Sequence, residues 1–178
     1  TNATLIAECD VASDESIGAL IKQVDEQWGE LDFLVHSLAY ADTQDLSKPF
    51  SETLRDGFNK AMEISAYSLL PLAKGVIPMM RKRGGGSIVS MSFIGSTLAV
   101  PNYNVMGPAK AALESCTRYL ARELGPENIR INSLSPGAIR TLSPAGIKDI
   151  SEMSRVAGEH SAMKRTATQA EVANTAAF

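Results

Sequence analysis

The sequence predicts an α/β fold built on a parallel β-sheet, and two observations support this prediction. Residues 31–37, 87–92 and 129–134 are short apolar segments that each lead into a loop, as the buried strands of a parallel sheet do. Longer segments with helical periodicity lie between them. Alternation of strand, helix and strand is typical of a parallel sheet with right-handed crossovers.

The first helix is expected over residues 14–28. Asp14 and Glu15 make its first turn acidic, and Gly29 follows as a stop signal. Its apolar residues recur at the spacing of one helix face: Ile17, Leu20, Ile21, Val24 and Trp28.

The second helical stretch, residues 51–80, is expected to consist of two pieces. Pro71 cannot donate to a carbonyl four residues earlier, so it should start, bend or end a helix. Residues 84–86 are three glycines, which we interpret as a flexible turn before a strand, since no helix follows them as a phosphate cradle requires. The third helix is expected over 105–124 and closes at Gly125.

One part of a familiar architecture is missing. A dinucleotide-binding sheet begins with a strand, a glycine-rich turn and a helix. No GxGxxG spacing occurs here; the sequence opens near a strand candidate at 5–9 and ends at Phe178 within a helical pattern. We therefore expect residues 1–178 to be a single α/β domain within a longer chain, without its N-terminal βα units and its C-terminal end.

Composition argues against several classes of protein. The 178 residues suffice for one domain, and a net charge of −3 offers no basic surface for nucleic acid or anionic membranes. The most apolar stretch, residues 69–80, is shorter than the ~20 residues of a membrane-spanning helix. Two cysteines and a start without a secretory pattern favour a cytoplasmic protein. No spacing of His, Cys, Asp and Glu suggests a metal site.

Residues 92–110 carry the densest set of chemically useful side chains. Tyr103 and Lys110 are seven residues apart, so a helix through both would place them on one face. A tyrosine with a pKa near 10 needs its phenolate stabilised to act as an acid or base, and a nearby ammonium does this. The spacing also fits a solvated helix face. A catalytic role is favoured because the segment follows the strand 87–92. It therefore lies at the carboxyl edge of the sheet, where α/β proteins bind ligands.

The segment 101–111, Pro-Asn-Tyr-Asn-Val-Met-Gly-Pro-Ala-Lys-Ala, resembles that of bacterial enoyl-[acyl-carrier-protein] reductases, a divergent branch of the short-chain dehydrogenase/reductase superfamily. Ordinary members of the superfamily use Tyr-x3-Lys, whereas the residue four before Lys110 is Met106. The Tyr-x6-Lys spacing therefore indicates the enoyl reductase branch. Further matches keep the same order: Cys-Asp-Val at 9–11, His-Ser-Leu-Ala at 36–39, Ile-Ser-Ala-Tyr-Ser at 64–68, Ile-Arg-Thr-Leu at 139–142 and Gly-Ile-Lys-Asp at 146–149.

The resemblance implies a doubly wound, Rossmann-like sheet and reduction of a trans-2-enoyl thioester on acyl carrier protein in fatty acid biosynthesis. NADH is the expected cofactor, with NADPH also possible. Hydride would reach C3 of the enoyl chain, Tyr103 would stabilise the enolate oxygen, and Lys110 would hydrogen-bond the nicotinamide ribose.

The resemblance also assigns the residues around this chemistry. Asp10 and Val11 would line the adenine pocket, and residues 142–157 resemble a mobile loop that closes over the acyl chain. The other expected cofactor-binding residues are Ser37, Leu38, Ala39, Ser92, Lys110, Ile139 and Thr141. The expected substrate-binding residues are Tyr40, Ala41, Phe93, Tyr103 and Met106.

Two residues depart from the family pattern. Phe93 stands where the family usually has a second tyrosine, which leaves two interpretations: an active site shaped for an unusual acyl chain, or impaired or altered chemistry. Pro108 removes a backbone donor near Lys110, which is harmless in a first helical turn and kinking deeper in a helix.

Other conspicuous residues have simpler interpretations. His36 is expected to be a hydrogen-bonded structural residue, Cys9 and Cys116 inert, and Tyr67 and Tyr119 packing residues. The helices around 64–80 and 109–124 are apolar on more than one side, which predicts a subunit interface, and the resemblance implies a homotetramer.

Two alternative functions remain open at this stage. One is another short-chain dehydrogenase/reductase acting on a carbonyl or an atypical unsaturated chain, suggested by Phe93 and by Ser135-Pro136-Gly137. The other is a catalytically silent homologue.

Overall fold

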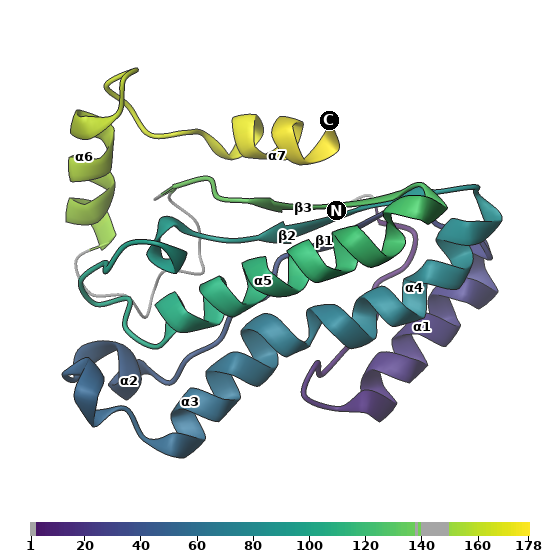
Figure 1. The fold of residues 1–178 in the computed structure, drawn as a ribbon, viewed down its shortest axis with the longest axis horizontal. Helices are drawn as coiled ribbons and strands as arrows, with labels where there is room; N and C mark the ends of the chain where they lie inside the picture. The colour runs from purple at the N-terminus through teal and green to yellow at the C-terminus, as the bar shows by residue number, and fades with distance from the viewer. Residues whose placement is uncertain (1–2, 138, 140–149) are drawn as a thin grey trace.

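A computed structural model describes residues 3–137, 139 and 150–178 and shows three parallel strands. The strands are β1 (Phe33–His36), β2 (Gly86–Met91) and β3 (Ile129–Leu134), in the order β1-β2-β3 (Figure 1). Each lies within or beside a segment predicted from the sequence, so the α/β parallel fold is confirmed. The candidate strand at residues 5–9 is wrong, because these residues have no regular structure.

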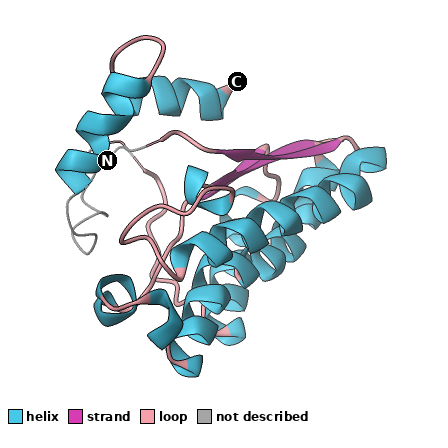
Figure 2. Ribbon diagram, turned by 60° about the vertical axis from the view of Figure 1, so that its left-hand side comes forward, coloured by secondary structure: helices cyan, strands magenta, loops and turns pink. Residues whose placement is uncertain are grey.

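Three helices cover one face of this sheet. They are α1 (Asp14–Trp28), α4 (Leu69–Lys82) and α5 (Met106–Leu124), with α4 packed between the other two (Figure 1). Between the helices and the sheet lies a core of fully buried side chains that includes Leu69, Met80, Ile88, Leu113 and Ile129. Two further helices, α6 (Ile150–His160) and α7 (Gln169–Ala177), lie on the side away from this layer (Figure 2).

The ends of α1 follow from its sequence. Ser13 caps the first turn by accepting a hydrogen bond from the Ser16 backbone at 3.2 Å. Gly29 ends the helix with a left-handed φ of 69°, a conformation that favours glycine. The prediction of a helix over residues 14–28 is confirmed.

The stretch 51–80 is more divided than predicted. It contains a 3-10 turn η1 (Phe50–Glu52), helix α3 (Arg55–Met62), a π-helical turn η2 (Glu63–Tyr67) and then α4. Pro71 lies in the first turn of α4, as a helix-starting proline should, and it cannot bond to the Tyr67 carbonyl four residues earlier. A further short helix, α2 (Thr43–Ser47), precedes η1.

Helix α5 begins at Met106, one residue after the start expected from the sequence. Pro108 is its third residue, where the missing N–H would have had no intrahelical partner, so the proline does not kink the helix. Tyr103, however, lies in the turn before α5. The helix expected over 105–124 is therefore confirmed to within one residue, and Tyr103 and Lys110 do not share it.

A closed set of buried hydroxyls fixes α5 against the carboxyl half of the sheet. Ser90 of β2 pairs in register with Ser133 of β3, and their hydroxyl oxygens are 2.7 Å apart. Thr117 of α5 lies 3.0 Å from each of them and donates to the Leu113 carbonyl. Since these polar groups satisfy one another, their burial is tolerated and the helix is held in one position.

Two aromatic residues do not pack as expected. Tyr67 is 51% exposed and Tyr119 is 78% exposed, so their interpretation as packing residues is wrong for the isolated chain. The turn at residues 84–86 is confirmed, with left-handed φ angles at Gly84 and Gly85. No helix among the described residues is long and apolar enough to span a bilayer.

Candidate active site

Tyr103 lies in the turn between the 3-10 turn η3 (Ile94–Ser96) and α5. Its side chain is only 7% exposed, and its ring packs on that of Phe93 with 4.8 Å between centroids and 56° between planes. Burial raises the pKa of the phenol, because the charged form loses its hydration. Stabilisation of a Tyr103 phenolate by Lys110 stays a prediction.

Lys110 reaches the carboxyl edge of the sheet from the second turn of α5. Its Nζ donates to the Met91 carbonyl at the end of β2 (2.7 Å) and to the Leu38 carbonyl beyond β1 (3.4 Å). The side chain is 5% exposed, and burial lowers its pKa to about 8. A buried ammonium at this edge stands where parallel α/β sheets bind ligands.

The loop after β1 is held by two serines of the helical stretch behind it. Ser65 of η2 accepts from the Tyr40 backbone N–H at 2.9 Å and donates to the Tyr40 carbonyl at 3.2 Å. Ser68 donates to the Ile64 carbonyl, so its oxygen accepts from Nε2 of His36 at 2.8 Å. His36 is thus the hydrogen-bonded structural residue that was predicted. Burial and the charge of Lys110 lower its pKa to about 4, which keeps it neutral.

The structure brings together four of the five expected substrate-binding residues. Ala41, Phe93, Tyr103 and Met106 belong to one apolar cluster. The fifth, Tyr40, stands apart: its hydroxyl donates to Asp42 at 2.7 Å, and the Lys60 ammonium lies 4.5 Å from its ring centre. The cluster therefore surrounds Tyr103, while Tyr40 forms a polar group on the surface.

A pocket of about 420 Å³ opens beside Tyr103. Its wall is mostly apolar, with Phe50 on one side, Leu98, Ala99 and Val100 from the loop after η3, and Ala111 from α5. Such a pocket suits an apolar chain brought next to a single phenolic donor.

Three side chains close to the site had no place in the sequence predictions: Glu114, Ser96 and Asn104. Glu114 accepts hydrogen bonds from Ser96 and from Ser92, which was an expected residue. Glu114 follows Lys110 by one helical turn in α5, and this spacing could have indicated Glu114 from the sequence. The side-chain amide of Asn104 donates hydrogen bonds to carbonyls at the end of α2.

The remaining expected residues are described only in part. Asp10 and Val11 lie before α1, where the Asp10 carboxylate accepts from the Ala12 backbone at 3.0 Å. Ile139 is present without regular structure, whereas Thr141 lies outside the described residues. Residues 142–149 of the expected loop also lie outside them, and residues 150–157 form the first part of α6. No group of three His, Cys, Asp or Glu side chains within the described ranges could hold a metal ion.

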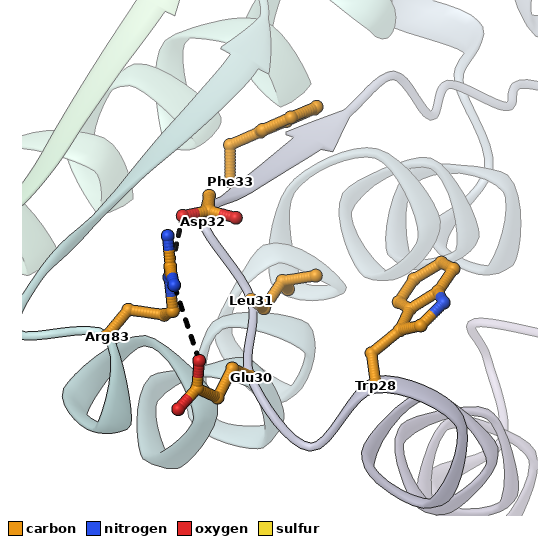
Figure 3. Close-up of a pocket in the computed structure, with 6 residues that line it drawn as sticks. All are labelled: Trp28, Glu30, Leu31, Asp32, Phe33 and Arg83. Carbon is orange, nitrogen blue, oxygen red and sulfur yellow. Dashed lines mark hydrogen bonds and ion pairs between the residues drawn. The ribbon is translucent and has the colours of Figure 1, made fainter.

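A second hollow lies at the opposite end of β1 (Figure 3). Trp28, Leu31 and Phe33 line it, together with Arg83, which pairs with Asp32 at 2.9 Å and Glu30 at 3.4 Å. It opens at the amino end of the strand, away from Lys110. Since parallel sheets bind ligands at their carboxyl ends, the Tyr103 pocket is the stronger candidate.

Comparison with known proteins gives one consistent family. A family model described as Enoyl-(Acyl carrier protein) reductase matches residues 1–178. The enoyl-[acyl-carrier-protein] reductase [NADH] FabI of Synechocystis sp. is 47% identical over 175 residues, which are 98% of this chain and 67% of that protein.

Solved structures agree with this. The crystal structure of FabI from Candidatus Liberibacter asiaticus matches with a TM-score of 0.95 and 37% identity, covering 99% of this chain and 68% of that one. An enoyl-(acyl-carrier-protein) reductase from Anaplasma phagocytophilum, in complex with NAD, matches with a TM-score of 0.91 and 38% identity, covering 98% and 66%. The chain spans about two thirds of the length of these relatives.

Proposed function

Because the chain belongs to the enoyl-[acyl-carrier-protein] reductase family, we propose that it reduces trans-2-enoyl thioesters carried on acyl carrier protein to saturated acyl thioesters. NADH is the cofactor, as in the relatives of that name. Two observations support this assignment: a buried phenol, that of Tyr103, lies beside a mostly apolar pocket, and a buried ammonium, that of Lys110, lies at the carboxyl edge of the parallel sheet.

The residues at this edge fit a nicotinamide nucleotide. A lysine ammonium has three N–H donors, and within the described residues two carbonyls, of Met91 and Leu38, accept from Lys110. One donor is left for a ribose hydroxyl. Ser37, Leu38 and Ala39 follow directly on β1 at the same edge, in position to line the nucleotide. When bound, NADH supplies the hydride that C3 of the substrate receives.

Tyr103 stabilises the charge that develops on the thioester oxygen. Because burial raises its pKa, the phenol keeps its proton and donates a hydrogen bond to this oxygen as it becomes an enolate. A hydrogen bond to a charged acceptor in a dry site is stronger than one to the neutral carbonyl, so the bond favours the transition state over bound substrate. The apolar cluster around the Tyr103 ring keeps water away from the thioester oxygen.

Phe93 supports an active enzyme rather than an impaired one. Its ring still packs on Tyr103 and so keeps the aromatic support and the burial of the phenol. What is lost is only a second hydroxyl, which leaves Tyr103 as the phenolic donor of the cluster.

The test is the oxidation of NADH with crotonyl and longer enoyl thioesters. We expect turnover that is lost in Tyr103→Phe, with NADH binding retained. Tyr119→Phe, which removes the hydroxyl of an exposed ring, is the matched control and should turn over like the parent. If Tyr103→Phe is as fast as the parent, the role given to Tyr103 is wrong; if the parent has no turnover with any enoyl thioester, the proposed function is wrong.

The finer proposals are a homotetramer and a cytoplasmic location. Tyr67, at the end of η2 just before α4, and Tyr119, in α5, have exposed rings. These rings support a subunit interface on this helix layer, because aromatic residues are enriched in protein interfaces. Sedimentation as a stable monomer would contradict the tetramer. The free thiols of Cys9 and Cys116 support a reducing compartment.

A further inference from the structure

We propose that Asn104 is a positioning residue for Tyr103, an inference that rests on the proposed function. The Asn104 side-chain amide donates toward three backbone carbonyls, of Asp45 (3.2 Å), Leu46 (3.1 Å) and Lys48 (2.8 Å). These carbonyls belong to the last turn of α2 and the residue that follows it. Carbonyls at a helix end have no partner within the helix, so the two N–H donors of this amide are shared among three carbonyls at the end of α2.

The turn that carries Tyr103 needs such a hold. Asn102 and Asn104, on either side of the tyrosine, both have left-handed backbones, with φ of 62° and 40°. Asparagine tolerates this conformation better than most residues, but it is still less favourable than an ordinary one. Two such residues flanking Tyr103 persist only where the surroundings enforce their conformation. The contact from Asn104 to α2 joins residues that are 56 to 59 positions apart in the chain.

The same contact ties together two parts of the site. Helix α2 follows the loop after β1 that carries the expected cofactor-binding residues 37–39. Tyr103 lies next to Asn104, and its ring rests against the backbone of Gly95, where an added Cβ would lie 2.5 Å from the ring. The ring of Tyr103 is thus supported by Gly95 and Phe93, and the neighbouring backbone is held through Asn104. Losing the amide releases the backbone and lets the phenol shift relative to the loop.

The effect on catalysis should appear in kcat. A displacement of ~1 Å between reacting groups costs roughly 100-fold in rate. Because the phenol acts in the transition state, its misplacement lowers kcat while leaving NADH affinity nearly unchanged.

Two variants separate the amide from the backbone conformation. Asn104→Gly keeps the left-handed φ without strain but removes the amide, and we expect kcat to fall about 10- to 100-fold. Asn104→Asp keeps the shape and the tolerance of left-handed φ, but its ionised carboxylate faces three carbonyl oxygens. Its kcat should be lower than that of Asn104→Gly at neutral pH. As the pH falls, the carboxyl group of the aspartate variant regains a proton that it can donate. The kcat of Asn104→Asp divided by that of Asn104→Gly should therefore rise.

Asn128→Gly is the matched control. Asn128 is also left-handed, with φ of 58°, and its amide also donates to a backbone carbonyl, that of Gly84 at 3.0 Å. It lies before β3, at the far end of the sheet from Lys110. We expect Asn128→Gly to lose as much stability as Asn104→Gly while keeping the parental kcat.

A readout independent of turnover uses protein labelled with 3-fluorotyrosine. The four tyrosines give four ¹⁹F signals, and Tyr103→Phe identifies one of them. We expect this signal to shift or broaden in Asn104→Gly and to stay unchanged in Asn128→Gly. An unchanged Tyr103 signal together with parental kcat in Asn104→Gly overturns the inference. An Asn104→Asp rate that runs parallel to Asn104→Gly at every pH also overturns it. Absence of turnover in the parent refutes the proposed function instead, and the ¹⁹F comparison then still decides the role of Asn104.

Discussion

Burial of Lys110 should make the chain less stable than the same chain without this charge, and the penalty should depend on pH. Burial lowers the pKa of the Lys110 ammonium from 10.5 to about 8. A difference of about 2.5 in pKa corresponds to about 3 kcal/mol of unfavourable free energy for keeping the proton in the folded state. This cost is fully present below pH 8, where both the folded and the unfolded chain carry the charge. It declines as the pH rises from 8 to 10.5, because the folded chain is then neutral while the unfolded chain is still charged.

The perturbation is Lys110→Met, which keeps the length of the apolar stem and removes the charge. The variant also leaves the Met91 and Leu38 carbonyls without a donor, but this loss does not change with pH. The pH dependence of the stability difference therefore isolates the titration of Lys110. Between pH 7 and pH 9.5 the free energy of unfolding of the parent should rise by about 2 kcal/mol relative to the variant.

The assay is urea unfolding followed by circular dichroism at fixed protein concentration, at several pH values from 7 to 9.5. Lys74→Met is the control, because Lys74 is exposed on α4 and its removal should give a difference that is flat over this range. Parallel stability curves for the parent and Lys110→Met would refute the reasoning, since they would mean that the ammonium is as well solvated in the folded chain as in the unfolded one.

Two further predictions concern the support of Tyr103. Phe93→Tyr should keep the ring contact with Tyr103, change the stability by no more than about 1 kcal/mol and leave kcat unchanged. A tenfold gain in kcat would instead show that the missing hydroxyl impairs the parent. Phe93→Ala should lose about 1–3 kcal/mol of unfolding free energy in urea. Gly95→Ala should lower kcat, because the added Cβ would lie 2.5 Å from the Tyr103 ring. The control is Gly18→Ala in α1, which has open space around it and should raise the thermal midpoint while leaving kcat unchanged. Equal kcat in both alanine variants would contradict the idea that the ring rests on Gly95.

The sequence predicted those parts of the fold that depend on local pattern. The strands β1, β2 and β3 are short apolar runs that each lead into a loop, a pattern typical of strands in a parallel sheet. Their burial is less complete than this pattern suggests, because Phe33 (64% exposed) and Val35 (41% exposed) leave one face of β1 open. Helix α1 was predicted with its correct ends because its signals, the acidic pair Asp14 and Glu15 and the stop at Gly29, lie in or directly after the helix itself. The π-helical turn η2 was not predicted, since the residues 63–67 look like any helix and only the interruption near Pro71 and the contacts of Ser65 set them apart.

The site shows the same division between local and non-local information. The family resemblance chose Ala41, Phe93, Tyr103 and Met106, and these form one cluster. The motif at 101–111 contains Asn104 but did not indicate its role, because the partners Asp45, Leu46 and Lys48 lie more than fifty residues away along the chain. Nor could the resemblance place Tyr40, whose hydroxyl is held by Asp42 and Lys60 through surface charges that no short motif specifies.

Tyr103 and Lys110 do not share a helix, although their spacing in the sequence would allow it. Seven residues are two turns of a helix, so a helix through both would have placed them on one face. In the structure the helix begins at Met106, and only Lys110 is helical. The phenol instead reaches its position through a turn with two left-handed asparagines, held by a neighbouring helix. A seven-residue spacing on a regular helix would therefore not reproduce this site, because the position of the phenol depends on the turn and on the contact that Asn104 makes.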